Sequence, residues 1–172
     1  GELNSHGQDS WVNDQRSIDW VSRDEMGDDS AIKEALFPSE LTDRDEFQRI
    51  ILRAAGDDNY PDGSNWPSFG PKLSAHLRDA YTHNLAKRGG MHLDVRSGTK
   101  AIIYLNGQYW GVYDLRELPD DHDFTDYNYS QGKFDLQYLL TWGDTWAEYW
   151  DTYPENPEQE WNLLVDFIKN ND

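Results

Sequence analysis

Residues 101–117 read AIIYLNGQYWGVYDLRE and carry the clearest local structural signal in the chain. Its first five residues are predominantly apolar, as expected of a strand. Asn106-Gly107 then supplies the strongest two-residue signal for a hairpin turn, because both central positions of a type I′ turn need a positive φ. Residues 108–117 return along the first strand. The sequence therefore predicts an antiparallel hairpin.

Other strand candidates precede this hairpin. Residues 17–22 alternate with a period of two, and residues 47–53 are rich in β-branched side chains. Between residues 56 and 71, Gly and Pro interrupt the chain repeatedly, which predicts a long loop. Long ordered loops in compact domains are often functional.

A helix is predicted after the loop, with Ser74 as its N-cap and Gly89-Gly90 after its basic last turn. Its apolar residues recur at three- and four-residue spacing, as in a helix packed against a sheet: Leu77, Ala80, Tyr81 and Leu85. Downstream we expect a short helix opening at 120–124, a strand or short helix at 134–140 and an amphipathic helix at 155–171. The fold class is α+β, an antiparallel β-rich lobe with a packed helix.

The composition excludes several classes of protein. The 172 residues carry 33 acidic and 15 basic side chains, a formal net charge of -18 that disfavours nucleic-acid binding. No apolar run approaches the roughly 18 residues of a membrane span. The 24 aromatic residues (8 Trp, 10 Tyr and 6 Phe) indicate a folded core rather than a disordered chain.

The absence of Cys excludes disulfides and thiol chemistry. Without an initiator Met, the chain resembles a processed or excised piece.

Several patterns are candidates for chemistry. The five His residues show no spacing typical of zinc ligands. Asp28-Asp29 and residues 120–123 offer oxygen ligands for calcium or magnesium, although solvated turns are the simpler explanation in a chain with 33 acidic residues. An aromatic cluster could stack on sugars or bind a partner protein, although closing the core against the last helix is the simpler explanation: Trp142, Trp146, Tyr149, Trp150 and Tyr153. Motifs of phosphate-binding loops and of nucleophile elbows are absent.

Four segments resemble one known family when taken together. Residues 51–59 are similar to its Leu-Arg-Asn-x-Gly-x-Asp segment, and residues 77–80 to its Arg-Asp helix. Residues 105–117 match the Leu-Asn-Gly-x-Tyr-x-Gly-x-Tyr-x-Leu-x-Glu hairpin of the CotH spore-coat protein kinases. Residues 6–27 resemble the N-terminal part of secreted bacterial members. Order and spacing agree over roughly residues 4–140.

The resemblance implies the N-lobe of an atypical, kinase-like fold that binds ATP with a divalent metal such as Mg²⁺ and phosphorylates Ser on coat or secreted proteins. It places Arg16 at the basic position that orients phosphates, Glu117 at its acidic partner, and Arg78 as a brace. Residues 1–140 would form this lobe. Residues 141–172 would lead toward a C-lobe carrying the catalytic base and the metal-binding Asp. No catalytic residue is therefore assigned within the chain, which we expect to be inactive alone.

Whether the chain belongs to an enzyme stays open at this point. A non-catalytic extracellular module that binds calcium, a protein or a carbohydrate is the alternative. Both interpretations place the chain outside the bacterial cell or on its surface, with a protein substrate or secreted partner. The basic residues available for phosphate are few: Arg16, Arg53, Arg78 and Arg116. Either these arginines converge on one pocket or the chain binds no phosphate.

Overall fold

The computed structural model describes residues 1–7, 11, 13–22, 29–41, 43–58, 75–119, 122–130, 138–141, 147–150 and 159–171. The chain divides into two compact units, Gly1–Pro119 and Asp120–Asp172. The division lies about twenty residues earlier than the boundary at 140 that the sequence suggested.

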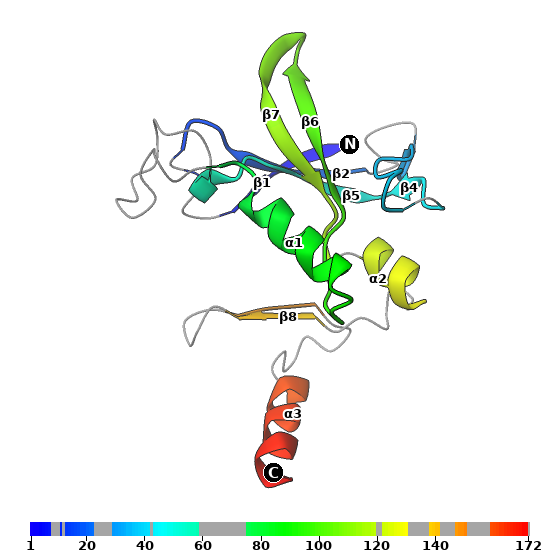
Figure 1. The fold of residues 1–172 in the computed structure, drawn as a ribbon, viewed down its shortest axis with the longest axis vertical. Coiled ribbons are helices and arrows are strands. Elements are labelled where there is room, and N and C mark those ends of the chain that lie inside the picture. Colours follow the sequence, from blue (N-terminus) through cyan, green and yellow to red (C-terminus); the bar gives the residue numbers. More distant parts are fainter. Residues whose placement is uncertain are drawn as a thin grey trace. The chain divides into compact units, whose positions relative to one another are not determined.

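The first unit is built on a five-stranded antiparallel sheet, which confirms the α+β class (Figure 1). The strands lie in the order β1 (Glu2–His6), β2 (Ser17–Val21), β5 (Arg49–Arg53), β7 (Gln108–Arg116) and β6 (Gly98–Leu105). The strand predictions at 17–22 and 47–53 are therefore confirmed. A second, two-stranded sheet pairs β3 (Ile32–Lys33) with β4 (Glu46–Phe47).

The β6–β7 hairpin forms as predicted. Asn106 and Gly107 have φ angles of 50° and 78°, the left-handed conformation that a type I′ turn requires. The register shifts between Ile103 and Tyr104, opposite Trp110 and Gly111, so a bulge bends the hairpin. Only the base of β7 pairs with β5, and the tip extends past the other strands (Figure 1).

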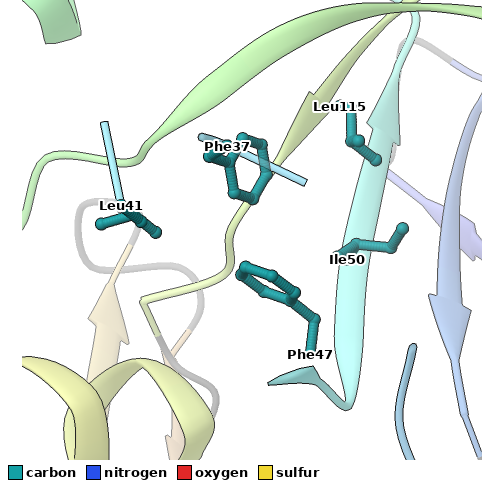
Figure 2. Packing of buried hydrophobic residues seen from close by; sticks show 5 residues of the cluster. All are labelled: Phe37, Leu41, Phe47, Ile50 and Leu115. Atoms are coloured by element: carbon teal, nitrogen blue, oxygen red, sulfur yellow. The ribbon is translucent and has the colours of Figure 1, made fainter. Parts of the chain in front are cut away.

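The hydrophobic core lies on one face of the large sheet. Ile50 of β5 and Leu115 of β7 face Phe37, Leu41 and Phe47, which come from the segment between β3 and β5 (Figure 2). The rings of Phe37 and Phe47 meet edge to face, with their centroids 5.4 Å apart. The segment between β3 and β5 therefore covers the apolar face of the sheet.

Helix α1 (Arg78–Arg88) lies in the predicted region but differs in two respects. Its N-cap is Leu77, which provides no side-chain hydrogen bond, whereas the expected N-cap Ser74 lies outside the described residues. Its apolar stripe is exposed instead of packed, and no residue of the helix is buried. The helix contacts the sheet through the charged side chain of Asp79 rather than through this stripe.

The second unit contains α2 (His122–Tyr129), a hairpin of β8 (Tyr138–Thr141) and β9 (Ala147–Trp150), and α3 (Gln159–Asn170). The predictions of a short helix near 120–124 and of a helix over 155–171 are confirmed, and the 134–140 segment contains a strand. Trp142 and Trp146 lie outside the described residues, and Trp150 ends β9.

Candidate functional site

The face of the sheet opposite the core is charged. Directly opposed residues in neighbouring antiparallel strands point to the same face, and Ile51 lies opposite both Asp19 and Arg116. Arg53 lies opposite Asp114. Because successive side chains alternate between faces, these residues all point away from the core. Asp19, Asp114 and Arg116 are nevertheless buried, so their charges depend on partners.

Asp79, in the first turn of α1, joins the helix to this charged face. Its carboxylate accepts a hydrogen bond from Arg116 Nη1, and Arg53 Nη1 lies 3.1 Å from Asp79 Oδ2. Burial lowers the pKa of Arg116, and the negative charges of Asp79 and Asp114 partly offset this by raising it. A guanidinium nevertheless stays charged in proteins. Two neighbouring strands, β5 and β7, thus hold one acidic residue of the helix.

Asp114 extends the network to the edge strand. It forms an ion pair with Lys100, its direct neighbour on β6, and Arg116 Nη2 lies 3.7 Å from Asp114 Oδ2. Lys100 Nζ also donates a hydrogen bond of 2.7 Å to the backbone oxygen of His76, two residues before the helix. The strand and the entry to α1 are therefore tied together.

The carboxylate of Asp58 accepts hydrogen bonds from the backbone at the beginning of α1. Asp58 belongs to the 3-10 turn η3 (Gly56–Asp58), and its carboxylate accepts the backbone N–H groups of Ala75, Leu77 and Arg78 at 2.7–2.9 Å. Burial would raise the pKa of Asp58, but these three donors and the charge of Arg78 lower it below its usual value. A residue from a distant turn thus replaces the missing N-cap side chain.

Glu117 forms a separate buried pair. Arg44 Nη1 lies 2.5 Å from Glu117 Oε1, and both side chains are almost completely buried. The second oxygen, Oε2, accepts the backbone N–H of Ser97 at 2.9 Å. The guanidinium of Arg44 also lies over the ring of Phe47, 4.4 Å from its centroid. The pair therefore fastens the end of β7 to the segment that covers the core.

The three predicted site residues do not meet. Arg16 is exposed and lies over the ring of Trp11, 5.1 Å from its centroid. Arg78 Nε lies 3.3 Å from Asp58 Oδ1, and Glu117 binds Arg44. Among the described residues, no hydrogen bond or ion pair joins any two of the predicted three. Of the four arginines considered for phosphate, only Arg53 and Arg116 converge, and they converge on Asp79.

Sequence reasoning gave no role to Arg53 and Asp79 as a pair, although both lie in the quoted segments. A usable signal existed, because Arg53 and Arg116 each end a strand, directly after the apolar residues Leu52 and Leu115. Such positions require an acidic partner, and Asp79 is the acidic residue in the first turn of the helix. What the sequence could not provide was the register that sets the two arginines side by side.

One buried donor of this group has no partner. Arg116 Nε is buried and has no hydrogen-bond partner among the described residues, whereas Arg53 Nη1 lies beside Asp79. A guanidinium N–H is a donor that can bind a phosphate oxygen.

A second charged group lies on the same face, at the β1 edge. Asp19 Oδ1 lies 2.9 Å from His6 Nδ1, and Asp19 Oδ2 lies 2.6 Å from Arg49 Nη2. Burial would raise the pKa of Asp19, but its hydrogen bonds to His6 and Arg49 lower it. The group connects strands β1, β2 and β5.

Metal ligation finds no support within the described part of the chain, where no three His, Cys, Asp or Glu side chains are grouped to hold an ion. Asp28, Asp120 and Asp121 lie outside the described residues. Asp29 is exposed and pairs with Lys33 at 2.7 Å. Among the described helices, none is both long and apolar enough to cross a membrane.

Comparisons with protein-family models, with curated proteins and with solved structures find no match.

Proposed function

We propose that this chain is the N-terminal lobe of a CotH-like, ATP- and Mg²⁺-dependent Ser protein kinase, secreted or displayed at the bacterial surface. The resemblance assigns the catalytic base and metal ligands to a C-lobe, so phosphoryl transfer requires both lobes. No phosphoryl transfer is expected from the chain alone, and its substrate would be a coat or secreted protein.

The observation that supports the proposal is the ion pair between the sheet and α1. In protein kinases, a basic residue on a central strand pairs with an acidic residue on the neighbouring helix and orients the nucleotide phosphates. Here Arg53 is on β5, at the centre of the sheet, and Asp79 is in the first turn of α1. Arg116 contacts the same carboxylate. We therefore assign the phosphate-orienting role to Arg53 and Arg116 rather than to Arg16.

The other predicted residues take indirect roles in this proposal. Glu117 positions Arg44 and the end of β7, and Arg78 fixes the start of α1 through Asp58. Arg53 and Arg116 would supply guanidinium groups to the phosphates of ATP. The described residues supply no comparable set of oxygens for Mg²⁺. The metal is therefore expected to bind through the nucleotide and the C-lobe.

Calorimetric titration with MgATP tests the assignment. We expect Arg53→Met to abolish the binding that the unsubstituted chain shows. Arg49→Met is the matched control, because Arg49 begins the same strand, points to the same face and is equally exposed, yet pairs with Asp19. If both variants lose MgATP binding equally, or if the unsubstituted chain does not bind MgATP, the placement of the nucleotide site at β5 would be contradicted.

A non-catalytic interaction module is a second candidate, and the tip of the β6–β7 hairpin favours it. Tyr104, Tyr109 and Trp110 are exposed there beside uncharged Asn106 and Gln108. Exposed rings next to amide side chains can stack on a sugar or insert into a protein groove. Quenching of tryptophan fluorescence by a glycan panel, lost in Tyr109→Ala, would support carbohydrate binding. If no glycan quenches the fluorescence, a protein partner would be favoured for the tip.

A further inference from the structure

Strand β6 forms one edge of the five-stranded sheet, and β1 forms the other. An edge strand leaves half of its backbone N–H and C=O groups without a partner in the sheet, and these groups can pair with a further strand. β1 is short, with five residues that include the acidic Glu2. β6 has eight residues, and Lys100 is its only charged side chain. The longer and less charged edge of the sheet is therefore β6.

The outer edge of β6 is regular and open. Within the described part of the chain, no strand except β7 pairs with its backbone. The bulge of the hairpin does not interrupt this edge, because the extra residue, Trp110, lies on β7. The free edge of β7 differs, since the Gln15 side chain donates a 2.8 Å hydrogen bond to the backbone oxygen of Val112 there. β6 has no such cover and no proline, and the charge of Lys100 is paired with Asp114.

The alternation of an antiparallel ladder indicates which backbone groups of β6 point outward. Leu105 lies opposite Gln108 beside the two-residue turn, where the strands of a hairpin exchange both hydrogen bonds. Because successive residues direct their backbone groups to opposite edges, Lys100, Ile102 and Tyr104 direct theirs away from β7. The side chains of these three residues are also exposed. β6 thus offers a row of donors and acceptors that an extended strand would satisfy together.

A second copy of β6 meets the requirements of this edge. Residues 101–113 contain no charged side chain, although the net charge of the chain is -18. Two such acidic chains repel each other, so an uncharged surface is where they can approach most closely. In antiparallel pairing centred on Ile102, each Ile102 faces its copy and Lys100 faces Tyr104 of the other strand. This register opposes no like charges, and it sets outward-pointing residues against each other, as backbone hydrogen bonding requires.

We propose that β6 pairs antiparallel with β6 of a second copy, so that the two five-stranded sheets join into one continuous sheet. Addition of a strand to a sheet edge is a known mode of protein recognition. The pairing is two-fold and uses the β6 edge of each copy once, so it closes at the dimer. It covers the open edge of both copies at the same time, which a peptide from another protein does not. This inference does not depend on nucleotide binding.

Sedimentation equilibrium of the whole chain from micromolar to millimolar concentration tests the proposal. We expect a reversible monomer–dimer equilibrium. Its dissociation constant should fall with added salt, because salt screens the repulsion between two acidic chains. A monomer throughout this range, or an open series of larger oligomers, would overturn the proposal.

Two substitutions at one position separate backbone pairing from side-chain contact. Ile102→Pro removes the outward N–H of each copy, at a position where an edge strand tolerates proline. Loss of these two hydrogen bonds should raise the dissociation constant by at least about tenfold. Ile102→Ala keeps the N–H and should weaken the dimer less, while circular dichroism of the monomer should be unchanged in both variants. Equal effects of the two substitutions would contradict backbone pairing at this edge.

Amide hydrogen exchange in the unsubstituted chain locates the contact without any variant. The N–H groups of Ile102 and Tyr104 should exchange more slowly as the proportion of dimer rises. The N–H of Ile103 points to β7 and should be protected at every concentration. A dimer in which Ile102 and Tyr104 exchange at rates independent of concentration would use another surface, and it would overturn pairing through β6.

Discussion

At the scale of single residues, Asp58 links the turn after β5 to the start of α1. Its carboxylate accepts three backbone N–H groups that would otherwise be left without partners. Because loss of a cap costs about 0.5–2 kcal/mol and buried unsatisfied donors add to this, Asp58→Ala should destabilise the fold by about 2 kcal/mol. Urea unfolding measures this change. The exposed Asp45→Ala control should stay within about 0.5 kcal/mol, and equal stability of the two variants would contradict the capping role.

His83 makes the stability of the fold depend on pH in the acidic range. The backbone N–H of Arg96 donates to its Nδ1, and burial lowers its pKa. A group whose pKa is lower in the folded state binds protons more readily when the chain unfolds. The contribution of His83 to folding stability is therefore complete above the pKa of histidine in the unfolded chain, about 6.5, and it is lost as the pH falls below that value. We expect the melting temperature to fall between about pH 7.5 and about pH 5.5, and to fall less in His83→Gln. Identical pH profiles would exclude His83 as the cause.

The Arg44–Glu117 pair should behave as a buried unit. Removing one partner leaves an uncompensated charge, so Glu117→Ala should cost about 3–5 kcal/mol of stability. Replacing both residues, as in Arg44→Met with Glu117→Leu, should cost less than the single change. A double-mutant cycle measured by urea unfolding checks this. Additive effects would mean that the pair does not act as a unit. If the single variant is unstable, its loss of ATP binding would not identify Glu117 as a phosphate ligand.

At the scale of elements, the β6–β7 hairpin depends on its turn. Gly107 has a φ of 78°, where a side chain is strained, so Gly107→Ala should destabilise the chain by about 1 kcal/mol. Gln108→Ala, which changes the exposed neighbouring position, is the control. Thermal unfolding of both variants checks the expectation. Indistinguishable melting temperatures would show that the turn does not limit stability.

Much of the element structure could be predicted from local signals. The hairpin follows from Asn106-Gly107, and the strands at 17–22 and 47–53 from their alternation and β-branched residues, because these signals act between near neighbours. The start of α1 could not be read in this way. Its capping carboxylate comes from Asp58, about twenty residues upstream, and no local pattern indicates such a partner.

The candidate site was less predictable than the fold for a similar reason. Arg16, Arg78 and Glu117 were assigned from a resemblance, yet each has a different partner in the structure. Convergence of Arg53 and Arg116 on Asp79 depends on the β5–β7 register and on the placement of α1. Both are long-range features, set by packing rather than by the spacing of residues.

At the scale of the whole molecule, the two units differ in what they contain. The first unit holds the five-stranded sheet, the apolar core around Phe37 and Phe47, and the ion pairs of α1. The strand pairing of this sheet lies entirely within residues 1–119. We expect this fragment to fold alone, with dispersed amide resonances and a cooperative thermal transition.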